Sequence, residues 1–137
     1  MIHIGTAVCV NEEGKLLMVL QGKPEEEKRW SVPGGKCEIG ETLPVCCARE
    51  VWEETGYKVE VMGHLRTKPG FYKEPYEVHY FDVKVLEGIA CIQDPDGLIY
   101  AIAWKSVDEL QALPLCFEED RHFLLQHIMK VTEEEVT

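Results

Sequence analysis

The chain has 137 residues, of which 45% are hydrophobic and 28% charged, a composition typical of one globular domain with its own core. It carries 14 basic and 25 acidic residues, for a formal net charge of −11. This charge disfavours direct binding to DNA, and a phosphate-bearing ligand would need a cation as intermediary.

The sequence favours a cytoplasmic protein without a membrane anchor. No run approaches the ~18 apolar residues of a membrane span, and the N-terminus lacks a basic segment followed by a cleavable apolar one. The cysteines form no C-x-x-C pair, so we expect small buried hydrophobic residues kept reduced in the cytoplasm. They are Cys9, Cys37, Cys46, Cys47, Cys91 and Cys116.

The first third of the chain predicts strands and loops. Residues 3–10 and 16–20 are rich in strand-forming residues, and the Asn and Gly between them predict a turn joining two antiparallel strands. Residues 21–30 are charged and contain a proline, which is typical of a mobile surface loop. Residues 31–42 are rich in Gly and predict a structured loop with one brief strand.

A helix is expected to begin near Thr42, whose hydroxyl can cap the first free N–H groups, with Pro44 in the first turn. It should end at Gly56, the residue type that adopts the left-handed conformation after a helix. Helical spacing predicts a core-facing stripe. Its members are Val45, Ala48, Val51 or Trp52, and Thr55.

The rest of the chain alternates strands and helices. Strands are expected at residues 57–67, 76–86 and 98–104, with a loop at 68–75 that contains two prolines and a glycine. A short helix should follow Ser106, a last helix should span about 117–131, and residues 132–137 should fray. This order predicts one α/β domain, residues 1–137, with a mixed β-sheet between helices.

Three glutamates of the first helix form an acidic cluster. Glu50, Glu53 and Glu54 lie at i, i+3 and i+4 and project from one helix face. Their repulsion costs a few tenths of a kcal/mol per pair, and they lie at the negative end of the helix dipole. One interpretation is a solvated face on which Arg49 partly neutralises Glu53. The other is a site for Mg²⁺, which prefers oxygen ligands.

Residues 35–57 favour the metal site, because they resemble the Nudix box of the MutT-like Nudix hydrolases. Each position of the motif is matched at the correct spacing, apart from Tyr57 in the final aliphatic position. The matching residues are Gly35, Glu41, Arg49, Glu50, Val51, Glu53, Glu54 and Gly56. The N-terminal strands and the segment from Trp30 to Lys36 are also similar to the family.

The resemblance implies an αβα sandwich and a hydrolase that cleaves the pyrophosphate of a nucleoside diphosphate linked to another moiety, using Mg²⁺ or Mn²⁺. It implies that Glu50, Glu53 and Glu54 and the Gly34 carbonyl are metal ligands. Glu53 or Glu50 would be the catalytic base, and Arg49 would brace the site together with a loop glutamate. Metal ions suit this chemistry because they neutralise phosphoryl charge and activate water.

A further acidic ligand common among relatives has no counterpart in the strand at 98–104. Asp94 and Asp96 in the preceding turn are one substitute. Glu118, Glu119 and Asp120 near the last helix are another. Both sets also have a structural interpretation, since Asp favours turns and acidic residues favour helix starts.

Substrate-binding candidates are aromatic and basic residues near the box. Trp30, Phe71 and Tyr72 can stack on a base, although such residues often belong to a core. Arg29 can meet phosphates, or merely balance the acidic residues that precede it.

The size of the chain favours (deoxy)nucleoside triphosphates as substrates. ADP-ribose or dinucleotides, decapping of RNA 5′ ends, and a non-catalytic nucleotide sensor are the alternatives. The acidic charge disfavours RNA, and the retained glutamates disfavour a sensor. A homodimer is compatible with the resemblance.

Overall fold

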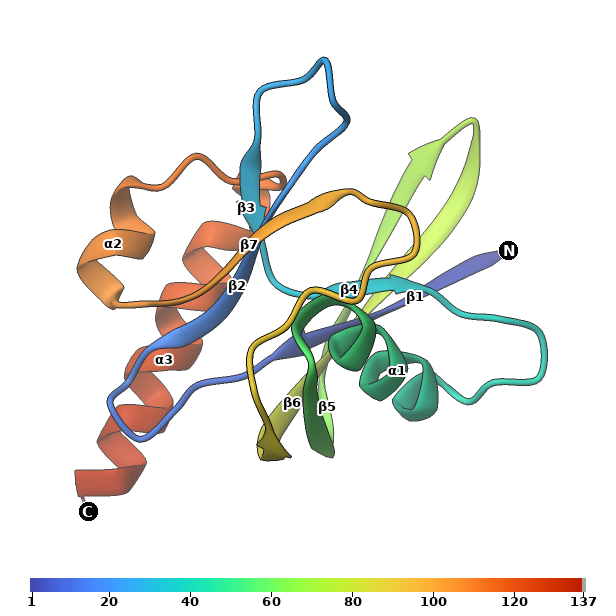
Figure 1. Cartoon of the computed structure of the whole chain (residues 1–137). Coiled ribbons are helices and arrows are strands. Elements are labelled where there is room, and N and C mark those ends of the chain that lie inside the picture. The colour runs from blue at the N-terminus through green and yellow to red at the C-terminus, as the bar shows by residue number, and fades with distance from the viewer. Residues whose placement is uncertain (137) are drawn as a thin grey trace.

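Seven β-strands divide into two sheets in the computed structural model, which describes the backbone of residues 1–136 and the side chains of residues 1–134 (Figure 1). The four-stranded sheet has the order β4-β1-β6-β5 and the three-stranded sheet the order β3-β2-β7. The strands are β1 (Ile2–Val8), β2 (Leu16–Gln21), β3 (Arg29–Ser31), β4 (Gly34–Lys36), β5 (Tyr57–Tyr72), β6 (Glu74–Gly88) and β7 (Ile99–Lys105).

The four-stranded sheet is mixed, as the sequence predicted. Strand β1 pairs parallel with β6 and antiparallel with β4, while β5 pairs antiparallel with β6. In the smaller sheet, β2 lies between β3 and β7 and is antiparallel to both. The consequence is that β4, which carries Gly34 and Gly35, lies at the edge of the larger sheet beside β1.

Helices cover both faces of the sheets. Side chains alternate along each strand, so Leu16 and Met18 point to one hydrophobic cluster and Leu17 to the other. The first cluster packs against α2 (Val107–Ala112) and α3 (Arg121–Val136), and the second against α1 (Leu43–Thr55). Figure 1 shows α1 on one side and α2 and α3 on the other. The αβα sandwich is therefore confirmed.

Helix α1 has the predicted ends but a different buried face. Thr42 accepts from the Val45 N–H at 3.3 Å, and Gly56 ends the helix with φ of 80°. The core stripe was partly wrong, because Val45 is 55% and Trp52 42% exposed. The buried side chains are Cys46, Cys47, Val51, Glu54 and Thr55. Small cysteines suit this face because Gly5 of β1 lies directly against them.

The loop predicted at residues 68–75 is wrong, because both strands continue through it. Strand β5 reaches Tyr72 and β6 begins at Glu74, leaving Lys73 with φ of 64° as the turn. Pro69 is tolerated because β5 is an edge strand, and its missing N–H costs no ladder bond on the open side. The result is a long hairpin that extends beyond the rest of the sheet (Figure 1).

The predicted N-terminal hairpin is only partly present. The turn is formed as expected, with the Asn11 side chain accepting from the Lys15 N–H at 2.9 Å. The strands meet at a single antiparallel bridge, between Val10 and Leu16, and otherwise belong to different sheets. This follows because β4 and β6 occupy the two edges of β1.

The C-terminal third follows the predicted order. Ser106 and Glu109 form a capping box at α2, and a short 3-10 turn, η1 (Glu118–Asp120), precedes α3. Helix α3 continues to Val136, past the end expected near residue 131, while residue 137 of the expected frayed tail lies outside the described residues. Across residues 1–136, no helix combines the length and apolar content needed to span a bilayer.

The six cysteines are free thiols in the described part of the chain. Cys9, Cys46 and Cys47 are buried, as expected of small hydrophobic residues. Cys91 is exposed, and the remaining two are partly buried, so burial holds for only half of the set.

Candidate active site

The acidic face of α1 lies directly against the two glycines of β4. The Gly34 N–H donates to Oε1 of Glu54 at 3.3 Å. A Cβ on Gly35 would overlap the Glu50 carboxylate, so only glycine lets the strand approach the helix this closely. The three predicted metal-binding glutamates and the backbone of Gly34 are therefore brought together.

Arg49 holds the preceding loop and the carboxylates in place. Its guanidinium donates to both oxygens of Glu41, from Nε at 2.6 Å and from Nη2 at 2.9 Å. Its Nη1 donates to Glu50 at 3.0 Å and to Glu53 at 3.1 Å. The Arg49 hydrogen bonds lower the pKa of Glu41 to about 2. The bracing contact expected between the loop and the helix is thus present.

Burial disfavours the charged forms of two of the carboxylates, Glu54 and Glu50, unless a cation lies nearby. Glu54 is only 6% exposed, and burial, followed by the charge of Glu50, raises its pKa well above the usual value. Burial also raises the pKa of Glu50, although Arg49 opposes the shift. Buried carboxylates without enough positive charge are what a divalent cation compensates. An all-oxygen donor set of carboxylates and a carbonyl fits Mg²⁺ or Mn²⁺.

These residues border a cleft of about 700 Å³. One wall is the segment that follows β6, which is hydrogen-bonded to the end of α1: Cys91 N–H donates to Thr55 O at 2.8 Å and Gln93 N–H to Glu53 O at 2.9 Å. The lining residues include Gln21, Gly34, Gly35, Lys36, Cys37, Glu38, Ile39, Arg49, Glu50, Glu53, Glu54, Asp94, Asp96, Leu98 and Ile99.

Of the two sets proposed for the additional acid, Asp94 and Asp96 line the cleft. The charge of Asp94 also contributes to the raised pKa values of Glu50 and Glu54. Its carboxylate accepts from the Leu98 N–H at 2.6 Å, so the turn-forming interpretation holds as well.

The second set, Glu118, Glu119 and Asp120, forms ion pairs and hydrogen bonds outside the cleft. Asp120 is buried and accepts hydrogen bonds from Arg66, Lys68 and Tyr80. Glu118 is paired with Arg121, and Glu119 with Lys68. None of these three acids belongs to the lining of the cleft. Glu119 and Asp120 therefore join η1 to the sheet, and Glu118 stabilises the start of α3.

The predicted substrate-binding residues are dispersed. Arg29 lines a neighbouring groove that shares Gln21 and Leu98 with the cleft. Trp30 packs against the core, with the Lys105 ammonium 4.3 Å from its ring centroid. Phe71 and Tyr72 lie at the hairpin tip, 73% and 70% exposed, and neither lines the cleft. The structure does not bring these three aromatic residues to the glutamates.

A second cavity, of about 190 Å³, lies on the other side of the Gly34–Gly35 strand. It shares Gln21, Gly34 and Gly35 with the cleft. The sequence interpretation missed it, because its walls come from segments far apart in the chain. The other lining residues are Ile4, Thr6, Ser31, Val32, Lys68, Tyr76, Val78, Tyr80, Phe117 and Asp120.

Comparison with known proteins identifies a family match and relatives of this chain. The family model of the NUDIX domain matches residues 1–126. Phosphatase NudJ of Escherichia coli strain K12 is 34% identical over 113 residues, which cover 79% of this chain and 71% of that protein.

Solved structures share the fold. A NUDIX hydrolase from Nitrosomonas europaea has a TM-score of 0.78 at 22% identity, covering 94% of this chain and 86% of its own. An ADP-ribose pyrophosphatase from Streptococcus suis has a TM-score of 0.66 at 21% identity, with coverage of 92% and 90%. With the domain match and the NudJ similarity, these findings show that the chain belongs to the NUDIX family and is a Nudix hydrolase.

Proposed function

We propose that the protein hydrolyses, in a metal-dependent reaction, the pyrophosphate bond of a nucleoside diphosphate linked to another group, with (deoxy)nucleoside triphosphates as the preferred class. The observation that carries the proposal is the convergence of Glu50, Glu53 and Glu54 with the Gly34 backbone on one cleft of about 700 Å³. A cleft of this size accommodates a small ligand. The net charge of −11 makes a bound cation necessary for an anionic substrate.

The residues of the cleft divide the chemical work. Glu50, Glu53, Glu54 and the Gly34 carbonyl would hold Mg²⁺ or Mn²⁺, which supplies charge neutralisation and a more acidic water. Glu53 or Glu50 accepts the proton of the attacking water. Arg49, which donates to both, holds these two carboxylates in position.

The cavity behind Gly34 and Gly35 suits the base of the nucleotide. Aromatic and aliphatic side chains line it, with a few polar groups among them, and Gln21 borders both spaces. Such apolar walls with sparse polar groups are typical of ligand pockets. In this arrangement the base occupies the small cavity and the phosphates extend past the glycines to the glutamates.

The alternative substrates are separated by a hydrolysis panel. The purified protein is incubated with dNTPs, ADP-ribose, dinucleotides, NADH, sugar nucleotides and capped RNA, with Mg²⁺ or Mn²⁺, and phosphorylated products are measured against Glu54→Gln as the blank. We expect the highest kcat/KM for a nucleoside triphosphate. Faster cleavage of ADP-ribose or a dinucleotide would replace the proposed substrate class, and metal-dependent binding without product would indicate a sensor.

The position of the base is tested by two matched aromatic substitutions. Phe117→Ala removes a wall of the small cavity, whereas Phe71→Ala removes an exposed ring at the hairpin tip. We expect Phe117→Ala to raise KM about 10-fold, the cost of one lost stacking contact, and Phe71→Ala to leave KM within about 2-fold. The reverse result would place the base at the hairpin tip, beside Phe71 and Tyr72, which the sequence offered as stacking candidates.

A further inference from the structure

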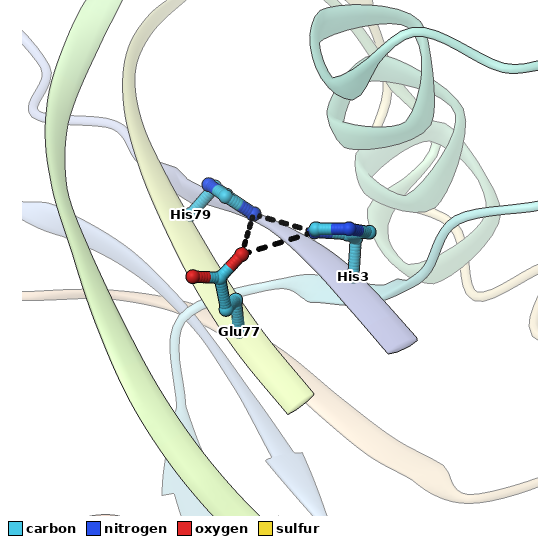
Figure 2. A group of neighbouring side chains, drawn as sticks. All are labelled: His3, Glu77 and His79. Atoms are coloured by element: carbon cyan, nitrogen blue, oxygen red, sulfur yellow. Dashed lines mark hydrogen bonds and ion pairs between the residues drawn. The ribbon is translucent and has the colours of Figure 1, made fainter. Parts of the chain in front are cut away.

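Two histidines and a glutamate converge on the sheet, outside the cleft. His3 comes from β1, and Glu77 and His79 come from the same face of the adjacent strand β6 (Figure 2). Nδ1 of His3 lies 3.0 Å from Nε2 of His79 and 3.5 Å from Oε1 of Glu77. The distance between Oε1 of Glu77 and Nε2 of His79 is 3.9 Å. None of the three lines the acidic cleft.

The spacing of the three donor atoms fits a tetrahedral zinc ion. Zinc holds nitrogen and oxygen ligands at about 2.0–2.1 Å, so the edge of its coordination tetrahedron is about 3.3–3.4 Å. The three observed separations of 3.0, 3.5 and 3.9 Å bracket this edge. Two imidazoles and a carboxylate are also a recognised zinc ligand set, which leaves the fourth position for water.

Hydrogen bonding alone does not satisfy this group. When both rings are neutral, the contact between His3 and His79 uses a single hydrogen, and no second hydrogen is available for Glu77. A cation that replaces this hydrogen would be ligated by both ring nitrogens and by Oε1 of Glu77.

The outer contacts orient the buried histidine. Nδ1 of His79 lies 3.0 Å from the Thr67 hydroxyl, which lies 2.8 Å from Nε2 of His64. Ligand histidines characteristically hydrogen-bond through the ring nitrogen that does not face the metal. Here the contact of Nδ1 with Thr67 holds the ring so that Nε2 of His79 faces His3 and Glu77.

The site is open to solvent on one side. The side chains of His3 and Glu77 are 43% and 38% exposed, whereas His79 is 10% exposed. An ion can therefore reach the group without any unfolding of the sheet.

We propose that His3, Glu77 and His79 form a binding site for a zinc-type divalent ion, separate from the acidic cleft. The ion cross-links the start of β1 to β6. It also lies close to β4, because the His3 carbonyl accepts from the Cys37 N–H at 2.8 Å, immediately after the strand that carries Gly34 and Gly35. Its occupation therefore stabilises the edge of the sheet on which the cleft is built.

The test is calorimetric titration of the metal-free protein with Zn²⁺ in the presence of saturating Mg²⁺, which occupies the acidic cleft. We expect His3→Gln and Glu77→Gln each to weaken Zn²⁺ binding at least ~10-fold, and Thr67→Val to weaken it about 10-fold through the orientation of His79. The matched control is His122→Gln, an exposed histidine on α3, which should bind as the wild type does.

A spectroscopic measurement on the wild-type protein tests the site even if the variants fail to fold. In long-range ¹H–¹⁵N spectra of the wild-type protein, one equivalent of Zn²⁺ should shift Nδ1 of His3 and Nε2 of His79 and leave His122 unchanged. Wild-type Zn²⁺ affinity in both His3→Gln and Glu77→Gln, or unshifted signals of His3 and His79 while Zn²⁺ binds, would overturn the proposal. In that case the ion is held by thiols or by the cleft.

Discussion

Glu54 is the residue whose environment most directly indicates a cation. It is nearly fully buried, faces the N–H of Gly34, and lies near the charges of Glu50, Asp94 and Glu53. The charged form of such a group is disfavoured unless positive charge reaches it. A bound metal ion would therefore offset the free-energy cost of burying the charged Glu54 carboxylate.

We predict that Glu53→Gln and Glu54→Gln each reduce kcat at least ~100-fold through loss of metal ligation. The measurement is steady-state hydrolysis of the preferred nucleotide over a range of Mg²⁺ concentrations. Glu12→Gln, at an exposed position, serves as control. Near wild-type rates for both variants at saturating Mg²⁺ would show that neither carboxylate holds the ion.

The stabilisation of the fold by Mg²⁺ should increase as pH rises. In the metal-free protein the pKa of Glu54 lies above its unfolded value, so its protonated form contributes stability below about pH 4.3 that is lost as pH rises through the folded pKa. Mg²⁺ requires the deprotonated carboxylate and reverses this loss. We expect the rise in Tm on adding Mg²⁺ to be larger at about pH 8 than at about pH 5, and Glu54→Gln to abolish most of the difference.

The pairing of Glu41 with Arg49 predicts the opposite pH dependence. The folded pKa of Glu41, about 2, lies below its unfolded value of about 4.3, so its contribution is complete above that value and is lost as pH falls towards 2. Glu41→Gln should lower the free energy of unfolding by about 1–2 kcal/mol at neutral pH. In urea unfolding, this difference should shrink between about pH 4 and about pH 2; a constant difference would contradict the assignment.

Among the structural elements, the ends of α1 were predictable, whereas the extension of the β5–β6 hairpin through residues 68–75 was not. The ends of α1 depend on Thr42 and Gly56, which act within one turn of the helix. The extension of β5 through Pro69 depends instead on pairing with β6 and on an open sheet edge. The buried face of α1 was likewise decided by a neighbour, since Gly5 lets β1 approach Cys46 and Cys47 closely.

Two glycines with positive φ, Gly56 at the end of α1 and Gly40 in the preceding loop, should differ in the stability that is lost on substitution by alanine. Gly56 has φ of +80°, and a Cβ there would lie 2.6 Å from the Ile89 carbonyl oxygen and 3.0 Å from the Cys91 nitrogen. Gly40 has φ of +88°, with nothing within 4 Å of the added atom. Gly40→Ala should cost about 1–2 kcal/mol, the cost of the left-handed conformation alone.

Gly56→Ala should cost more than Gly40→Ala, because the backbone atoms of residues 89–91 must also move. It should lower hydrolysis as well, since this segment leads to Asp94 in the cleft. Chemical denaturation of both variants checks the stability order. Equal losses would mean that the segment adapts without strain.

Across the entire fold, Asp120 joins the last helix to the sheet. Its buried carboxylate accepts from Lys68 of β5 at 2.9 Å, and from Arg66 of the same strand and Tyr80 of β6. This network fastens the C-terminal third of the chain to the β5–β6 hairpin, since Tyr80 and Asp120 are 40 positions apart in sequence.

Replacing Asp120 by Asn should lower the free energy of unfolding by about 3–5 kcal/mol, because Arg66 and Lys68 would lose their buried counter-charge. Tyr80→Phe should cost about 1 kcal/mol for one hydrogen bond. Glu119→Gln, at a side chain that is 61% exposed, is the control and should cost less than about 1 kcal/mol. Urea unfolding measures all three; a small effect of Asp120→Asn would show that solvent relaxes the network.

The features predictable from the sequence alone are those encoded within a few residues: the caps of α1, the i, i+3, i+4 spacing of the glutamates, and the glycines beside them. Such local signals act through backbone geometry that neighbours in sequence share. They were sufficient for the ends of α1 and for the grouping of Glu50, Glu53 and Glu54, whereas the αβα sandwich was implied by the resemblance of residues 35–57 to the Nudix box.

Long-range pairing decided the rest. It placed Asp94 in the cleft and Asp120 in a buried network, and it left Phe71 and Tyr72 at an exposed hairpin tip. It also brought His3 within 3.0 Å of His79, a residue 76 positions away. Strand register sets such contacts, and register depends on the free energy of packing the entire sheet rather than on any one segment.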